Sequence, residues 1–437
     1  MKKAAPLAAI LLASAVLAAG QASPSSRPTA VVGGTVHTAS GPDIVNGTVL
    51  IRGGKIVAVG AGPAIPADAI VVDAKGKHVY PSLLPPITEL GLVEIGAVRA
   101  TVDTTETGEI NPEARADFAM NFDSELLPVA RSGGVLLAGV APAGGIVSGS
   151  LAVMKLDGWT REDAGIKAPA AIMVVWPNLH MDRSQTARLS VRLQEKRRDE
   201  AVRKLKDTFA DARAYGRARA AEKEAGIPRH DADPKLEALQ PAVDGKIPVI
   251  VVAHSLAQIR AALAWAKEEN LKLVLGGAED GWLAAEEIAK AGVPVIAAPS
   301  LELPRRSDEP YDAAYANAGL LAKAGVTVAF NDDSTWNVRN LPHQAAMAVD
   351  FGFPREKAVA AMTLVPAQIL GVADRVGSLE PGKDATLFIA DGDILDIRSR
   401  VVAAWVDGRT LDLTDKQKRL YERYRSRPKA SASGRAP

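Results

Sequence analysis

Three side chains capable of acid–base or metal-binding chemistry follow apolar runs in the sequence. His254 follows "VIVVA", Glu89 follows "PPIT", and Asp333 follows "VAFND". Imidazole and carboxylate groups can transfer protons or hold a divalent cation. Asp332, one residue earlier, is the alternative register for the carboxylate at 333. We therefore take Asp333 and His254 as candidate catalytic residues, and Glu89, His254 and Asp333 as candidate metal ligands.

These residues end strand-like runs that alternate with amphipathic helical runs. Apolar runs at 246–255, 271–280, 292–300 and 325–334 have helical stretches between them, and this alternation predicts parallel β/α units. Residues 81–374 are long enough for a (β/α)8 TIM-like barrel, which takes about 250 residues and places its chemistry at the C-terminal ends of its strands. The alternative is an open doubly wound sheet, but no Gly-rich dinucleotide turn follows a first strand.

Short strands are predicted at both ends of this middle region. Residues 28–80 and 375–412 carry β-branched runs broken by Gly, Pro and Asp turns. We expect the two segments to form one small composite β-sandwich domain. The predicted fold is thus α/β, a barrel with a sandwich built from the N- and C-terminal segments.

Residues 181–225 are dense in charge and predict a long surface helix inserted in the barrel, broken near Gly216. A pair such as Glu200–Lys204 would support the helix at i,i+4 spacing. The segment is interpreted as a solvated face, with a lid or a dimer arm as the alternative. Residues 427–437 have the composition of a disordered tail.

The N-terminus has the order of a secretory signal peptide. A basic "MKK" precedes an apolar run and a small-x-small site ending at Ala22. Residues 1–22 are therefore predicted to be removed, which implies an exported, periplasmic protein. The alternative is a membrane anchor, although the run is short for a span of about 20 apolar residues.

The composition of the chain limits the classes of partner that we expect. The chain has 52 Lys and Arg against 51 Asp and Glu, a balance that predicts neither nucleic acid nor, after signal cleavage, a membrane as partner. It has no Cys, which excludes disulfides and thiolate metal sites. A small-molecule ligand or substrate is the expected partner.

Long stretches of the sequence resemble one superfamily. The front "GGTVHT…GTVLIRGGKIVAVG", the back "VGSLEPGKDATLFIADGD…VVAAWVDGRTL" and residues 339–372 occur in the order found in the amidohydrolase superfamily. The similarity is greatest to exported imidazolonepropionase-like and prolidase-like members. It covers roughly residues 30–411, almost the whole chain after Ala22, and implies a TIM barrel with a composite β-sandwich.

The resemblance also implies a divalent-metal centre at the barrel mouth, where metal-bound water attacks a carbonyl. Carried over position by position, the His-x-His pair of the family's first strand falls on Ile87 and Glu89 of this chain. The His of the fifth strand falls on Val252, and that of the sixth strand on Gly277. The Asp of the last strand falls on Asp333. Most ligand positions are thus substituted.

No cofactor is therefore expected, and the alternative is a single weakly bound Zn or Mn held by Glu89, His254 and Asp333. A buried Glu89 would need a partner, and one hypothesis pairs it with an arginine from a neighbouring strand end. The arginines considered are Arg305, Arg306 and Arg339.

Two classes of function follow. By resemblance the protein is a hydrolase of non-peptide C–N bonds, or of dipeptides, in small molecules, with a substituted metal site. The alternative is a metal-free pseudoenzyme that binds a ligand or acts as a partner subunit of an active amidohydrolase paralogue. A homo-oligomer is the other assembly considered.

Overall fold

A computed structural model describes residues 27–184, 186–222 and 231–426. The predicted signal peptide and the predicted C-terminal tail lie outside these residues, so both stay predictions. Among the described helices, none combines the length and the apolar character needed to cross a membrane.

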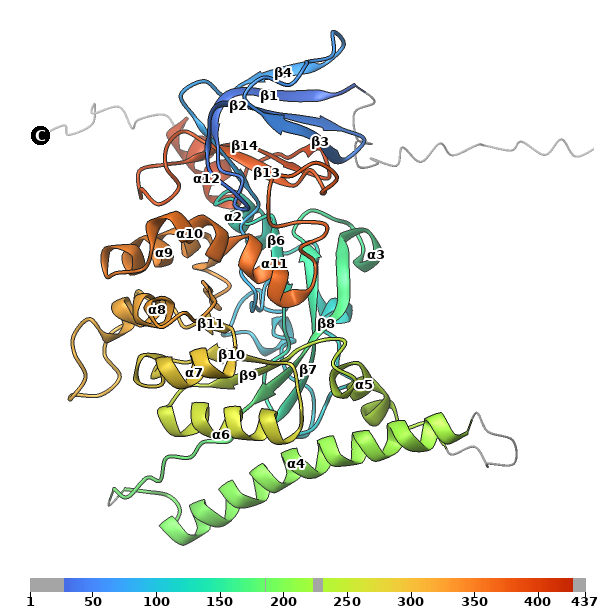
Figure 1. The fold of residues 1–437 in the computed structure, drawn as a ribbon, viewed down its shortest axis with the longest axis vertical. Coiled ribbons are helices and arrows are strands. Elements are labelled where there is room, and N and C mark those ends of the chain that lie inside the picture. The colour runs from blue at the N-terminus through green and yellow to red at the C-terminus, as the bar shows by residue number, and fades with distance from the viewer. Residues whose placement is uncertain (1–26, 185, 223–230, 427–437) are drawn as a thin grey trace, which may run out of the picture.

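One sheet joins the two ends of the chain (Figure 1). Strands from the first part pair with strands from the last: β5 lies between β1 and β13 in the order β15-β14-β13-β5-β1-β2-β3, and β4 pairs with β1. The pairing between β5 and β13 is antiparallel, with Tyr80 opposite Phe388. The strands are β1 (Thr29–Val36), β2 (Ile44–Arg52), β3 (Lys55–Gly60), β4 (Ile70–Asp73), β5 (His78–Pro81), β13 (Leu387–Ala390), β14 (Val401–Val406) and β15 (Arg409–Thr410).

The middle of the chain forms a second, curled sheet in the order β12-β11-β10-β9-β8-β7-β6. Pairing is parallel from β8 to β12, as the β/α alternation predicts, but β7 is antiparallel to both of its neighbours, β6 and β8. Only residues 156–164 join β7 to β8, too few for the crossover that parallel strands need. The strands are β6 (Leu137–Val140), β7 (Val147–Lys155), β8 (Gly165–Val175), β9 (Val249–Ala253), β10 (Leu273–Gly277), β11 (Val295–Ala297) and β12 (Val328–Ala329).

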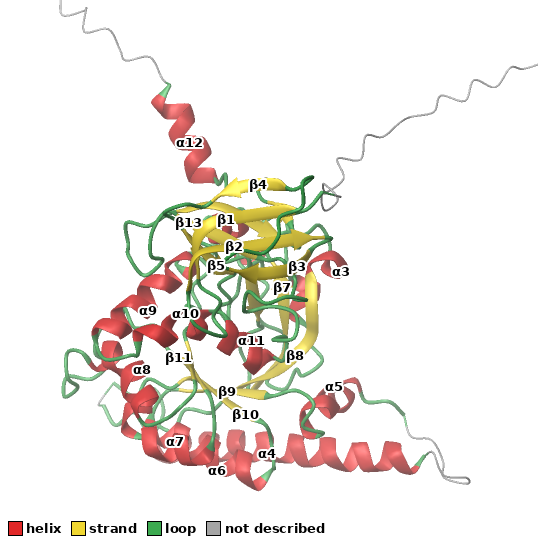
Figure 2. Ribbon diagram, turned by 45° about the horizontal axis from the view of Figure 1, so that its top comes forward, coloured by secondary structure: helices red, strands yellow, loops and turns green. Residues whose placement is uncertain are grey.

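Helices flank the parallel part of this sheet, and Figure 2 shows α6 to α10 along one side of it. Alternate residues of β9 pack in two directions: Val249 and Val251 in the cluster shared with these helices, Ile250 inside the curled sheet. The helices are α1 (Ala116–Ala119), α2 (Leu126–Arg131), α3 (Arg161–Ala164), α4 (Val191–Ala221), α5 (Pro234–Val243), α6 (Leu256–Glu268), α7 (Ala285–Ala291), α8 (Ala313–Lys323), α9 (Leu341–Asp350), α10 (Arg355–Met362), α11 (Leu364–Leu370) and α12 (Lys416–Arg425), with 3₁₀ turns η1 (Arg99–Thr101), η2 (Gly281–Leu283) and η3 (Val338–Asn340).

Within the predicted insert, helix α4 runs without interruption, so the predicted break near Gly216 is wrong. The helix begins later than predicted, because residues 181–184 and 186–190 are not helical. A Cβ at Gly216 would lie 2.3 Å from the side-chain oxygen of Gln240, so the glycine admits that side chain of α5. The predicted Glu200–Lys204 pair is also wrong. Lys204 instead reaches Glu109, 2.8 Å away, and Lys196 faces Glu200 at 3.7 Å.

Candidate functional site

Residues 81–92, on which the family's first-strand pattern falls, close the barrel. Pro81 ends β5, and the remaining residues form no named strand. Pro85 and Pro86 lack N–H donors and interrupt the ladder. Isolated parallel bridges remain on the β6 side, where the Thr88 N–H donates to the Gly139 carbonyl at 2.8 Å. On the β12 side, the Ile87 N–H donates to the side-chain oxygen of Asn331 at 3.0 Å.

Two of the positions predicted to have lost a metal-binding His lie in an apolar cluster inside the barrel. Ile87 and Val252 pack against buried side chains that include Ile250 and Val274. A Cβ at Gly276 would lie 3.3 Å from Cδ1 of Ile87 and 3.5 Å from Cγ2 of Val252. Aliphatic side chains therefore fill the floor of the barrel mouth.

His254 continues the inward alternation of β9 and ends at the mouth. Its backbone N–H donates to the side chain of Gln258, which also completes the capping box of α6. Its ring Nδ1 lies 2.7 Å and 2.6 Å from the two carboxylate oxygens of Glu279. Arg305 approaches the same carboxylate at 3.0 Å, so the three side chains form a row at the ends of β9 and β10.

Gly277, another position predicted to have lost a metal-binding His, lies next to this row. Gly277 has a left-handed φ of +81°. A Cβ there would lie 3.0 Å from Nδ1 of His254 and 3.2 Å from Oε2 of Glu279. The His254–Glu279 pair thus occupies the space into which a side chain at 277 would project.

The hydrogen bond from His254 determines the charge of Glu279. Burial would raise the pKa of this carboxyl group, but the His254 hydrogen bond and the nearby Arg305 lower it below its ordinary value. Glu279 is therefore held as a carboxylate with two cationic or polar partners.

The two aspartates after β12 face different surroundings. Asp332 is buried and accepts hydrogen bonds from the Gln344 side chain and the Ser334 N–H, both at 3.1 Å. Burial raises the pKa of Asp332. Asp333 is exposed and lines a pocket at the mouth. The hydrogen bonds of Asp332 hold the loop after β12 in place. Of the two aspartates, Asp333 is the one accessible to a ligand.

Glu89 lies half-buried near Asp333. Burial first, and then the negative charge of Asp333, raise the pKa of the Glu89 carboxyl group. The hypothesis of an arginine partner is wrong among the described residues. Arg305 pairs with Glu279, Arg306 pairs with Asp280 and Glu309, and Arg339 lies against Gly133.

A pocket of about 270 Å³ lies at the strand ends after β10, β11 and β12, where barrel enzymes place their sites. It combines an aromatic wall, proline and aliphatic surface, and carboxylates. The lining residues are Glu279, Trp282, Ala298, Pro299, Glu302, Leu303, Pro304, Arg305, Glu309, Ala313, Ala314, Asn317 and Asp333. Two of the predicted site regions thus share one cavity, since Asp333 and the partner of His254 both line it.

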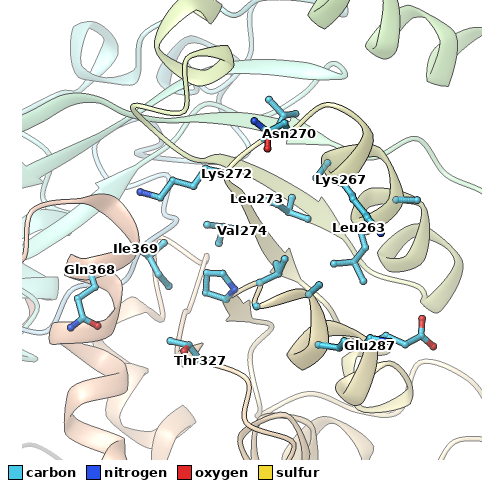
Figure 3. Close-up of a pocket in the computed structure, with 18 of the residues that line it drawn as sticks. Leu263, Lys267, Asn270, Lys272, Leu273, Val274, Glu287, Thr327, Gln368 and Ile369 are labelled. Carbon is cyan, nitrogen blue, oxygen red and sulfur yellow. The ribbon is translucent and has the colours of Figure 1, made fainter.

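A larger hollow, of about 960 Å³, opens at the other ends of the strands (Figure 3). It lies among Leu263 and Lys267 of α6, Leu273 at the start of β10, and Gln368 and Ile369 of α11. None of the three candidate residues lines it. We therefore place the candidate site at the smaller pocket.

Comparison with known proteins agrees with this architecture. A family model described as "Amidohydrolase family" matches residues 237–414. The crystal structure of an amidohydrolase from Thermotoga maritima MSB8 superposes with a TM-score of 0.78 at 26% identity, covering 88% of this chain and 99% of the other. The chain belongs to the amidohydrolase superfamily.

Other members of the superfamily are more distant. Amidohydrolase tasK from Hapsidospora irregularis is 25% identical over 390 residues, which is 83% of this chain but 39% of that protein. The chain thus spans about two fifths of the length of this curated relative. A prolidase complexed with N-methylphosphonate-L-proline (TM-score 0.52, 15% identity, 88% and 99% covered) and a molinate hydrolase (0.51, 18%, 89% and 95%) share the fold.

Among the described residues, the side chains at the mouth of this superfamily member include no cluster of metal donors. Metal ions in proteins are bound by several imidazole, carboxylate or thiolate donors converging on one point. Within residues 27–184, 186–222 and 231–426, no group of three or more His, Asp, Glu or Cys side chains is placed to hold a metal ion. Aliphatic groups and the His254–Glu279 pair occupy three of the positions where the superfamily's ligands are expected, and Glu89 and Asp333 hold the other two.

Glu279 is the functional candidate that sequence reasoning missed. It stands two residues after Gly277, at the end of the same strand, in the stretch "GGAED". That position at a strand end was a usable signal. The contact with His254 needed the register of β9 against β10, which pairs Ala253 with Gly277.

Proposed function

We propose that this amidohydrolase-superfamily protein binds a small molecule in the mouth pocket and does not carry out metal-dependent hydrolysis. The single observation that supports this most is the filling of three of the five metal-ligand positions by Ile87, Val252 and the His254–Glu279 pair. A protein of this superfamily that only binds a ligand needs a pocket but no metal ion, and the mouth combines a pocket with filled metal positions.

The walls of the pocket suggest how a ligand would be held. Trp282 and the prolines Pro299 and Pro304 offer flat apolar surface, and Asp333 offers a hydrogen-bond acceptor. A few polar groups on a mostly apolar wall are typical of small-molecule sites. The cavity volume suits a ligand at or below the small end of the usual range, such as a dipeptide or a small amide.

Metal analysis of the purified protein tests the first half of the proposal. We expect substoichiometric Zn and Mn after dialysis, and no rise in melting temperature on adding either ion, because binding to the native state alone would raise it. One tightly bound ion per chain would contradict the proposal. Glu89→Gln and Asp333→Asn then identify its ligands, because each would release the ion.

A thermal-shift screen of dipeptides and small amides tests the second half. A binder should raise the melting temperature of the parent chain, and Asp333→Asn or Trp282→Phe should weaken that shift at least severalfold. Asp350→Asn, an exposed aspartate at the end of α9, is the matched control and should leave the shift unchanged. Equal shifts in all variants would place the ligand elsewhere.

A second candidate, hydrolysis of a C–N bond without metal, is favoured by one observation. Asp333, a possible base, lies near Glu89, whose raised pKa favours the protonated form that a general acid needs. If this candidate holds, turnover of an amide survives chelation and is lost in both Asp333→Asn and Glu89→Gln. Turnover that persists in both variants would exclude these residues.

A further inference from the structure

Helix α12 differs from the other helices longer than eight residues in that none of its residues is buried. Figure 2 shows it standing clear of the rest of the ribbon. Leu420, Tyr421 and Tyr424 are 37%, 62% and 60% exposed. The helix therefore offers an uncovered face that neither the fold nor the proposed pocket uses.

This face has a regular layout around the helix axis. At 3.6 residues per turn, Leu420, Tyr424 and Tyr421 fall within an arc of roughly 100°. Lys416 and Arg423 lie at one edge of the arc, and Lys418 and Arg425 at the other. An aromatic strip is thus bordered by cations on both sides.

The opposite side of α12 is attached to the body of the protein. Arg419 reaches both carboxylate oxygens of Glu125, just before α2, at 2.8 Å each. The buried side chain of Asp415 caps the helix by accepting from the Lys418 N–H at 2.8 Å. These contacts hold the helix by its start and its back, with the aromatic strip turned away.

Charge on this segment is strongly uneven. Residues 416–437 carry eight Lys and Arg and a single acid, Glu422, a net charge of +7, although the whole chain has a net charge of only +1. The chain-wide balance, which suggested no anionic partner, averages over this segment. Lys418 and Arg425 have local carboxylate partners, Asp415 and Glu422, but exposed pairs of this kind are weak and exchangeable.

We propose that α12 docks the protein on a membrane surface that contains anionic phospholipid. Tyrosine rings settle at the level of lipid headgroups, and flanking Lys and Arg side chains extend to the phosphates. Each cation near such a surface adds to the binding, and the effect falls with salt. The Arg419–Glu125 contact would keep the pocket-bearing body beside the surface.

Vesicle co-sedimentation of the full-length chain tests the proposal. We compare vesicles of phosphatidylcholine with and without phosphatidylglycerol, at low and high salt. Because the apolar run before Ala22 could itself bind lipid, the readout is the part of the binding that needs anionic lipid. Lys416→Glu with Arg423→Glu should lower that part about tenfold or more, and Tyr421→Ser with Tyr424→Ser should lower it severalfold.

Matched charge reversals on α4 provide the control. Arg192 and Arg197 are exposed there as Lys416 is on α12, so Arg192→Glu with Arg197→Glu should leave vesicle binding unchanged. Unchanged melting temperatures would show that every variant folds. The proposal fails if anionic vesicles bind no better than neutral ones, or if the α4 variant loses as much binding as the α12 variant. It also fails if the α12 changes abolish only self-association or nucleic-acid binding.

Discussion

Two glutamates at the barrel mouth, Glu89 and Glu279, differ in the side chains that surround them. Glu279 has His254 and Arg305 within hydrogen-bond distance, and its pKa is lowered. Glu89 has no ion pair among the described residues, and burial and Asp333 raise its pKa. The ends of β9 and β10 thus carry a paired polar arrangement, whereas segment 81–92 consists largely of aliphatic and proline residues and leaves its acid without a cation among the described residues.

The largest effect is expected from disturbing the close approach of segment 81–92 to β6. A Cβ at Gly139 would lie 2.0 Å from the Pro86 carbonyl oxygen. Because a Cβ and a backbone oxygen have no rotamers, only a shift of the backbone could relieve this clash. Gly139→Ala should therefore lower the free energy of unfolding by about 3 kcal/mol or more, measured by urea denaturation. Gly62→Ala, at an exposed glycine with nothing within 4 Å of its Cβ position, should change it by less than about 0.5 kcal/mol. Similar losses in both variants would show that the closure of this segment is loose.

Removing the charge of Glu279 should have an intermediate effect. Because its folded-state pKa lies below the ordinary value, its ionisation stabilises the fold above that value, and this contribution is lost as the pH falls through the lowered pKa. Glu279→Gln should cost about 1 kcal/mol at pH 7, since the site is partly exposed, and less as the pH approaches 3. A cost that does not vary with pH would mean that the carboxylate only fills space.

Glu89→Gln should act in the opposite direction. A raised folded-state pKa means that the protonated form is favoured in the fold, so stability is full below the ordinary value and is lost as the pH rises through the raised pKa. The variant should therefore be more stable than the parent by a few tenths of a kcal/mol at pH 7, with no gain at pH 4. Destabilisation at pH 7 would reveal a partner for Glu89 and remove the contrast with Glu279.

The smallest effect is the coupling between Glu89 and Asp333. Asp333→Asn removes one cause of the raised pKa of Glu89, so it should reduce the gain from Glu89→Gln. A double-mutant cycle at pH 7 should give an interaction of a few tenths of a kcal/mol, weaker at high salt. An interaction energy of zero would mean that burial alone raises the pKa of Glu89.

Much of the architecture was readable from the sequence because it depends on patterns with a fixed period. Apolar runs after residue 246 predicted the parallel strands β9 to β12, each followed by a helix. The antiparallel pairing of β6 to β8 was not predicted, because runs buried on both faces look alike in either orientation. Gly216 failed as a helix-break signal because a side chain from another helix uses the space.

The candidate site was predicted in part. His254 and Asp333 lie at the strand ends where they were expected, and both regions meet at one pocket. The partner of His254 was not predictable from local pattern, since Glu279 becomes a neighbour only through strand register. The arginine hypothesis for Glu89 failed for a similar reason: Arg305 and Arg306 pair with Glu279 and Asp280, and Arg339 lies against Gly133.

The left-handed backbone at Gly277 has a consequence for how such a protein could change. A histidine introduced at this position would meet a strained φ of +81°, and its Cβ would lie 3.0 Å from Nδ1 of His254. The His254–Glu279 pair would therefore have to move before position 277 could accept an imidazole. Designing a metal-binding variant of this chain thus takes at least two coordinated changes, one at 277 and one at the pair.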